Sequence, residues 1–142
     1  MDSFDYIVIG GGSGGNSSAR RAAAYGAKVL AIERGRHNDG CGMGGTCVNF
    51  GCVPKKVMFN AAMHAEMLHT AKSYAFKDIK DVEYGSFDWS TLKKKRDAYV
   101  ARLNGIYERN LGKNNISLVY GAAKFVDNHT VEVNGDKYTA KH

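Results

Sequence analysis

The stretch that decides the fold is "IGGGSGG", residues 9–15. It follows a short apolar run, "FDYIVIG" at residues 4–10, whose length and glycine ending are typical of one buried parallel strand. The alanine-rich residues 13–26 predict a helix that stops at a glycine, and "AKVLAIE" at residues 27–33 predicts a second buried strand. A strand–helix–strand unit of this kind predicts an α/β fold with a parallel sheet.

The glycines of this stretch form the pattern G-x-G-x-x-G at Gly10, Gly12 and Gly15. Gly10 permits a tight turn, Gly12 lets the backbone approach a pyrophosphate, and Gly15 allows close packing of helix on strand. Because the chain holds 17 glycines, the pattern alone is weak, but a predicted strand precedes it and a predicted helix follows it. The phosphates would then bind at the N-terminus of that helix.

An acidic residue, Glu33, ends the second predicted strand. A carboxylate there can accept hydrogen bonds from ribose hydroxyls and would repel a 2′-phosphate, which favours FAD or NAD over NADP at this site. The alternative is a tight turn followed by a surface glutamate.

The rest of the chain alternates helices with strands. After a glycine-rich loop at residues 34–43, a helix around Pro54 carries one apolar face, made of Val57, Met58, Ala61, Ala62, Ala65 and Leu68. A second helix is predicted over residues 89–111, with Asp88 or Ser90 as its N-cap. Strand residues follow at 116–126, and then a hairpin at residues 130–140 with an Asn-Gly turn.

Two cysteines, Cys47 and Cys52, lie five residues apart in "GGTCVNFGCVPKK", residues 44–56. A zinc site, two small buried residues and a redox-active disulfide are the three interpretations. Zinc ligands are usually paired two to four residues apart, and Cys41 is the only other thiol. In a regular helix the two Cα atoms would be about 8–9 Å apart. A disulfide needs about 7 Å or less. A bridge therefore requires a distorted turn, for which Gly51 supplies the freedom.

The residues after Cys52 match what dithiol chemistry needs. Pro54 suits the first turn of a helix, and a helix N-terminus with Lys55 and Lys56 nearby stabilises a thiolate. A short loop gains little stability from a bridge. Electron transfer is therefore a better explanation of the cysteine pair than stabilisation of the fold by a disulfide.

Charge and composition exclude several classes of function. The net charge is +6, but the basic residues are scattered, and the densest run, residues 93–96, lies in a predicted helix and indicates a solvated face. We expect no nucleic-acid partner. The apolar runs are too short to span a bilayer, and three cysteines argue against a secreted disulfide scaffold. With no secretory or mitochondrial signal visible, we expect a cytoplasmic protein, with a mitochondrial form as the alternative.

"YIVIGGGSGG" and "GGTCVNFGCVPKK" together resemble the flavoprotein disulfide reductases. Within that family, "SARRAA", "RDAYVARLNGIY" and "YGAAKF" are similar to the glutathione reductases, and the resemblance covers about residues 5–142. Thioredoxin and trypanothione reductases share "VPKK" or a close variant, so such an enzyme remains an alternative. A truncated, non-catalytic flavin-binding module is another.

The resemblance implies an NADPH-dependent enzyme with bound FAD that reduces glutathione disulfide through a Cys47–Cys52 disulfide. It makes Cys52 the thiolate next to the flavin and Cys47 the thiol that attacks the substrate. Lys55 completes the implied catalytic set, beside the reactive end of the flavin, and no metal is implied.

The other implied site residues bind cofactor or substrate. The implied FAD contacts are Gly10, Gly12, Ser13, Gly14, Gly15, Glu33, Thr46, Cys47, Lys55 and Ala123. The implied glutathione contacts are Ser13, Arg20 and Tyr107. Without the resemblance, Arg20 would be interpreted as an exposed helix charge and Tyr107 as a packing residue.

In this family the chain would be the N-terminal part of a partial FAD-binding, Rossmann-like domain, residues 1–142, without the NADPH-binding and dimerisation domains. The full-length protein would be a homodimer, and we expect these residues alone to be inactive. The loop at residues 34–43 is longer than in most glutathione reductases and carries Cys41. Cys41 is interpreted as either an inert surface thiol or an off-pathway partner for Cys47.

Overall fold

The computed structural model describes residues 2–35, 42–78 and 86–142. Cys41 and most of the 34–43 loop lie outside the described residues. The predicted strand–helix–strand unit is confirmed as β2 (Tyr6–Ile9), α1 (Ser13–Ala24) and β3 (Val29–Glu33). Strand β4 (Ser117–Tyr120) pairs with the other edge of β3, so β2, β3 and β4 form a parallel sheet with β3 in the middle.

A second sheet covers one face of the parallel sheet. Its strands are β1 (Asp2–Phe4), β7 (Asp136–Ala140), β6 (Thr130–Val133) and β5 (Lys124–Phe125), in that order across the sheet. The predicted hairpin is confirmed as β6 and β7, and Asn134 and Gly135 have φ values of 54° and 90°. Both positive values are what a two-residue type I′ turn requires.

The strand predicted over residues 4–10 is confirmed for residues 6–9, but Phe4 belongs to a separate strand, β1. The chain bends at Asp5, so that β1 pairs with β7 in one sheet and β2 pairs with β3 in the other. The Asp5 carboxylate accepts hydrogen bonds from the Lys28 backbone N–H at 2.9 Å and from Lys141 Nζ at 2.7 Å. These contacts hold the bend between the two sheets.

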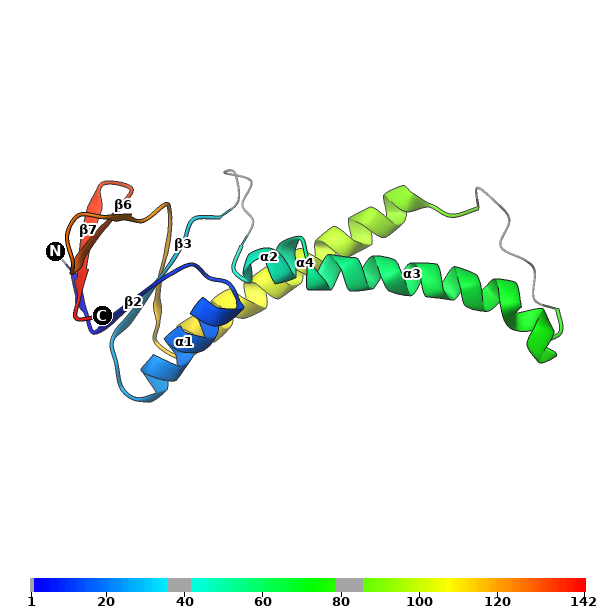
Figure 1. Cartoon of the computed structure of the whole chain (residues 1–142), viewed down its shortest axis with the longest axis horizontal. Coiled ribbons are helices and arrows are strands. Elements are labelled where there is room, and N and C mark those ends of the chain that lie inside the picture. The colour runs from blue at the N-terminus through cyan, green and yellow to red at the C-terminus, as the bar shows by residue number, and fades with distance from the viewer. Residues whose placement is uncertain (1, 36–41, 79–85) are drawn as a thin grey trace.

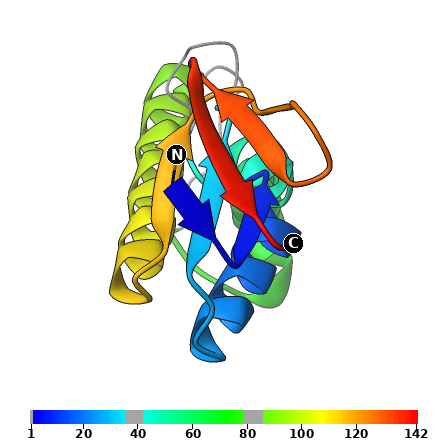
Figure 2. The ribbon, with the colours of Figure 1, turned by 90° about the vertical axis from the view of Figure 1, so that its left-hand side faces the viewer.

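The core lies on both faces of β3, which explains its uninterrupted apolar sequence. Val29 and Ala31 pack with the helices, and Leu30 and Ile32 pack with the second sheet. Figure 2 shows the β6–β7 hairpin on one side of the parallel strands and the helices on the other. A strand buried on both faces needs apolar residues at every position rather than at alternate ones.

The helices after β3 form an arm that extends away from the sheets, whereas both termini lie at the opposite end (Figure 1). The arm contains α2 (Gly45–Asn49), α3 (Cys52–Thr70), the 3₁₀ helix η1 (Ala71–Tyr74) and the first part of α4 (Trp89–Lys113). The last part of α4, with Leu111, packs in the core on the helix side of the sheet. Helix α4 covers the predicted range and runs two residues further. Its N-cap is Asp88, which accepts from the Thr91 backbone N–H at 2.9 Å.

The apolar residues predicted to share one face all lie on α3, but none of them is fully buried. Pro54 is the only residue of α3 that is fully buried, and Met58 and Leu68 are 39% and 43% exposed. The reason is that the described contacts of α3 are mainly with α2, η1 and α4. Helical periodicity predicts which residues share a face, but it does not predict that another element covers that face.

None of the helices in the described part of the chain combines the length and the apolar character that a membrane-spanning segment needs.

Candidate functional site

The glycine turn between β2 and α1 has the geometry that its sequence predicts. Gly10 has a φ of 107°, in the left-handed region that favours glycine, and its N–H donates to the Ile32 carbonyl at 2.7 Å. A β-carbon at Gly15 would lie 1.8 Å from the Gly10 carbonyl oxygen. The first glycine therefore makes the turn, and the last lets α1 pack directly on the strand.

The N-terminus of α1 opens at this turn. Gly12 is the N-cap residue and carries no side chain that could satisfy the first N–H groups of the helix. Ser13 and Gly14 follow as exposed first-turn residues. Backbone donors at a helix N-terminus, together with the positive end of the helix dipole, suit a phosphate group.

The carboxylate of Glu33 lies at the end of β3, beside the glycine turn. It accepts from the Gly11 N–H at 2.6 Å and from the Gly35 N–H at 2.9 Å, through different oxygens. Each carboxylate oxygen has two acceptor sites, so each can accept one more hydrogen bond. The side chain is thus oriented by backbone donors and can still accept hydrogen bonds from two neighbouring hydroxyls.

A cleft of about 440 Å³ opens at the carboxyl ends of β2 and β3. It is lined by Ile9, Gly10, Gly12, Ile32, Glu33, Arg34, Gly45, Gly121, Ala122 and Ala123. A second hollow of about 200 Å³ shares Glu33, Arg34 and Gly45 with it and reaches Thr46 and Phe50. The two form one trough at the strand ends, where open α/β sheets bind their ligands. Of the sequence-predicted cofactor contacts, it brings together Gly10, Gly12, Glu33, Thr46 and Ala123.

The two cysteines lie on either side of a break between α2 and α3. The backbone N–H groups of Phe50 and Gly51 both donate to the Thr46 carbonyl, at 2.9 and 2.7 Å. A β-carbon at Gly51 would lie 3.3 Å from the Cα atom of Cys47. The distorted turn that the sequence predicts is therefore present, and it brings Cys52, the first residue of α3, back toward Cys47.

Both cysteines are free thiols in the structure, with Cys47 half-buried and Cys52 exposed. A hydrogen bond between the two side chains raises the pKa of Cys47 above its ordinary value of 9.0. Desolvation and the charge of Cys52 act in the same direction, and the charge of Lys55 opposes them. The Cys52 side chain is thus close enough to favour the protonated form of Cys47. The disulfide between them stays a prediction.

A groove of about 580 Å³ between α3 and α4 begins at Cys52. It is lined by Cys52, Val53, Lys56, Val57, Asn60, Lys95, Arg96 and Tyr99. This lining has three cationic side chains and, among the described residues, no acidic one. A groove of this charge beside an exposed thiol suits an anionic substrate.

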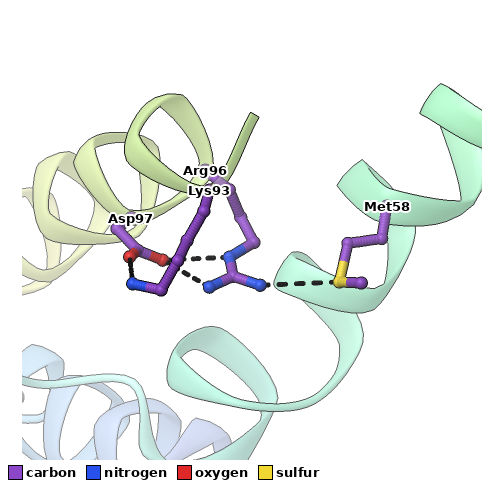
Figure 3. Close-up of polar contacts among 4 residues, drawn as sticks. All are labelled: Met58, Lys93, Arg96 and Asp97. Carbon is purple, nitrogen blue, oxygen red and sulfur yellow. Dashed lines mark hydrogen bonds and ion pairs between the residues drawn. The ribbon is translucent and has the colours of Figure 1, made fainter. Parts of the chain in front are cut away.

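The guanidinium of Arg96 joins the two walls of this groove (Figure 3). It donates to Asp97 Oδ1 through Nε at 2.9 Å and through Nη2 at 2.7 Å, and Nη1 donates to Met58 Sδ on α3 at 3.5 Å. Lys93 Nζ lies 2.6 Å from the other Asp97 oxygen. Hydrogen bonds from Lys93 and then from Arg96 lower the pKa of Asp97. The Arg96 side chain is therefore held in place on the groove wall.

The other predicted site residues differ in how far they are buried. Lys55 is exposed in the first turn of α3, next to the cysteine turn. Arg20 is exposed on α1, on the same face as Ser13. Tyr107 is half-buried on α4 and packs against the core on the helix side of the sheet, as the packing interpretation requires. No contact tests the predicted substrate roles of Ser13, Arg20 and Tyr107, which stay predictions.

Sequence reasoning missed the asparagines that surround the site. Asn104 on α4 bonds to Asn49 at the end of α2, and Asn16 on α1 is buried with an Oδ1 atom that has no partner among the described residues. An amide side chain on an otherwise apolar helix face was the signal that could have indicated a buried polar contact. No group of three or more His, Cys, Asp or Glu side chains in the described ranges has a metal-binding arrangement.

Comparison with known proteins identifies this arrangement. A family model described as "Pyridine nucleotide-disulphide oxidoreductase" matches residues 4–142. The chain belongs to this family. The predicted α/β fold and the predicted family are thus confirmed.

Three relatives within the family carry the name glutathione reductase. The chain is 61% identical to the protein of Debaryomyces hansenii over 132 residues, which are 92% of this chain and 26% of that protein. It is 59% identical to the protein of Yarrowia lipolytica over 120 residues, 84% of this chain and 24% of that protein. It is 53% identical to the protein of Schizosaccharomyces pombe over 130 residues, 92% of this chain and 26% of that protein. The chain spans about a quarter of the length of these relatives.

Proposed function

We propose that this chain is the N-terminal, FAD-binding part of a glutathione reductase that uses NADPH to reduce glutathione disulfide. The observation that carries the proposal is the turn at Gly51, which brings Cys52 back toward Cys47 next to the trough at the strand ends. Identity to three glutathione reductases over most of the chain favours this substrate over thioredoxin or trypanothione disulfide.

The residues of the trough fit FAD. Gly45 has a φ of 61°, and a β-carbon there would lie 2.8 Å from the Cα atom of Gly12, so the two loops form a cradle that only glycines allow. The N-terminus of α1 would bind the pyrophosphate, and the unused acceptor sites of Glu33 would bind ribose hydroxyls. When bound, FAD accepts two electrons from NADPH and makes them available to the protein disulfide.

The thiol chemistry then belongs to the two cysteines. The Cys47 sulfur, as thiolate, attacks one sulfur of glutathione disulfide, so that a mixed disulfide forms and one glutathione thiolate leaves. The Cys52 thiolate attacks the Cys47 sulfur of this mixed disulfide, which forms the Cys47–Cys52 disulfide and releases the second glutathione. Two electrons and two protons return the disulfide to the thiols seen here. The cationic groove would attract the negatively charged substrate.

Partners and location belong to the same proposal. We infer a homodimer of the full-length protein in the cytoplasm, with a mitochondrial form as the alternative. Sedimentation of the purified full-length protein tests the first statement, and fluorescence microscopy of the tagged protein in cells tests the second.

The deciding experiment uses the full-length protein with NADPH and a panel of disulfides. Glutathione disulfide is expected to be reduced much faster than thioredoxin or trypanothione disulfide. Cys47→Ser is expected to abolish turnover while NADPH still bleaches the flavin absorbance, because the variant forms neither the protein disulfide nor the mixed disulfide, whereas reduction of the flavin by NADPH needs no thiol. A preference for another disulfide, or full turnover in a Cys47→Ser/Cys52→Ser double variant, would contradict the proposal. A protein that binds FAD but whose flavin NADPH does not reduce would support a non-catalytic module.

A further inference from the structure

Two asparagines connect α4 to the segment that carries the cysteines. Asn104 Nδ2, on α4, donates to the Met43 carbonyl at 2.7 Å and to Asn49 Oδ1 at 3.0 Å. Asn49 Nδ2, at the end of α2, donates to the carbonyls of Gly42 and Gly45 at 3.2 and 2.9 Å. The amide of Asn104 uses both of its N–H bonds, and so does the amide of Asn49.

The residues around this network are closely packed. A β-carbon at Gly42 would lie 2.7 Å from the β-carbon of Asn104, so the loop backbone lies directly against α4. The Met43 side chain is fully buried in the core on the helix side of the sheet. Polar groups so close to the core must keep their hydrogen bonds, because a buried polar group without a partner destabilises the folded state.

The network fixes one end of α2, and the glycine turn fixes the other. The Gly44 N–H donates to the Gly11 carbonyl at 2.8 Å, and Gly45 packs on Gly12. Cys47 is the middle residue of this five-residue helix. Its position relative to Cys52 therefore depends on contacts at both ends of α2, although Asn104 touches neither sulfur in the described structure.

We propose that Asn104 is a positioning residue that holds α2 in the place where Cys47 lies opposite Cys52 across the Gly51 turn. This rests on the proposed function for its effect on turnover, but not for its effect on the thiol pair. Asparagine is required because two acceptors, the Met43 carbonyl and Asn49 Oδ1, need donors from one planar group. An ionised aspartate of the same shape offers no donor and places a charge against both acceptors.

The test uses the full-length protein with Asn104→Asp. The first readout is the equilibrium between the Cys47–Cys52 disulfide and its dithiol in buffers of reduced and oxidised glutathione, quantified by mass spectrometry. We expect the constant for disulfide formation to fall roughly tenfold or more, because a displacement of about 1 Å can cost up to 10²-fold. With saturating substrate, kcat is expected to fall by a similar factor while KM changes little.

The matched control is Asn110→Asp. Asn110 is also half-buried on α4, and the hydrogen bond recorded for it uses its backbone carbonyl, which accepts from Asn114 Nδ2 at 2.6 Å. It is expected to leave the disulfide equilibrium and kcat unchanged. An Asn104→Asp protein with the wild-type equilibrium would overturn the proposal.

Should Asn104→Asp fail to fold, Asn49→Asp tests the same network from α2, since it keeps the acceptor for Asn104 and loses both donors. It is expected to lower the equilibrium constant for disulfide formation as Asn104→Asp does. A wild-type equilibrium constant in Asn49→Asp would overturn the proposal. Where both single variants fold, the double variant is expected to be no worse than the worse single one, because both break one network; additive losses would contradict this. A wild-type protein that forms the disulfide but does not reduce glutathione disulfide would refute the proposed function and leave this inference standing.

Discussion

The last glycine of the turn, Gly15, packs on the first, Gly10, so closely that a β-carbon at Gly15 would lie 1.8 Å from the Gly10 carbonyl oxygen. The neighbouring atom is backbone and cannot rotate away. Gly15→Ala is therefore expected to push α1 off β2 and to destabilise the protein by about 1–3 kcal/mol, the usual cost of overpacking. Thermal unfolding of the full-length protein measures this loss, and FAD retained after gel filtration measures the damage to the turn.

Gly14→Ala is the matched control, because Gly14 lies on the same helix and a β-carbon there would have nothing within 4 Å. Alanine is the better helix former, so this variant is expected to unfold at the same or a higher temperature. Equal losses in both variants would mean that close helix–strand packing is not what the last glycine provides.

The carboxylate of Glu33 supplies the next prediction. Glu33→Gln keeps the shape but replaces one acceptor oxygen with a donor that faces the Gly11 or the Gly35 N–H. Hydrogen bonds to charged groups contribute about 1.5–3 kcal/mol, so FAD is expected to bind roughly 10- to 100-fold more weakly. Titration calorimetry of FAD into the apoprotein measures the change. Glu66→Gln, on the exposed surface of α3, is the control and should bind FAD like the wild type.

The raised pKa of Cys47 predicts a pH effect with a definite sign. The hydrogen bond with Cys52 is the main cause that raises the pKa of Cys47, and Lys55 lowers it. Cys52→Ala removes that cause and leaves Lys55 in place, so the pKa of Cys47 is expected to fall. At a fixed pH near 8 a larger fraction of Cys47 is then thiolate, so Cys47 should react faster with iodoacetamide. The curve of reaction rate against pH should shift to lower pH.

The Cys52→Ser variant separates the two effects of Cys52 on this profile. Serine keeps a hydroxyl that can hydrogen-bond but carries no charge, so its profile is expected between those of the wild type and Cys52→Ala. A Cys47 profile that does not move in either variant would show that the two side chains are not in contact in solution.

Sequence alone predicted those parts of the site that depend on neighbours in the chain. The glycine turn and the break before Cys52 each follow from a few consecutive residues, and Glu33 follows from its place at the end of a strand–helix–strand unit that is visible in the sequence. The Asn104–Asn49 bond joins residues 55 positions apart, and nothing local marks the two as partners. Sequence analysis therefore located the site but missed the network that orients it.

The same distinction explains the errors in the fold. The bend at Asp5 depends on Lys141, which is 136 residues away, so the apolar run at residues 4–10 looked like one strand. The apolar face of α3 was predicted correctly as a pattern, but burial requires a partner element. Met58 shows the difference, because it is 39% exposed, although Arg96 of α4 contacts its sulfur.

The N-cap of α4 predicts a second pH effect. Hydrogen bonds from the side chain and then from the backbone N–H of Thr91 lower the pKa of Asp88. A lowered pKa in the folded state means that the cap stabilises the helix at pH values above about 3.9, the ordinary aspartate pKa, and that this contribution disappears as the pH falls through the lower folded value. Asp88→Ala is expected to speed amide hydrogen exchange in the first turn of α4 at neutral pH.

Asp88→Asn is the control for that experiment, since asparagine caps helices about as well as aspartate and does not titrate. It should retain the slow exchange at neutral pH and lose the dependence on acid. Fast exchange in Asp88→Asn would indicate that charge, rather than the hydrogen bond to Thr91, holds the end of the helix.

The contact between Gly45 and Gly12 provides the last prediction. Gly45 has a φ of 61°, and a β-carbon there would lie 2.8 Å from the Gly12 Cα atom. Gly45→Ala combines two costs, the left-handed backbone at about 1–2 kcal/mol and a clash that separates the cysteine loop from the glycine turn. Gly26→Ala isolates the first cost, because Gly26 has a φ of 88° with nothing within 4 Å of its β-carbon. If the cradle between the loops holds FAD, titration should show weaker binding in Gly45→Ala alone, although both variants lose stability. Equal affinities in the two variants would mean that FAD does not use this contact.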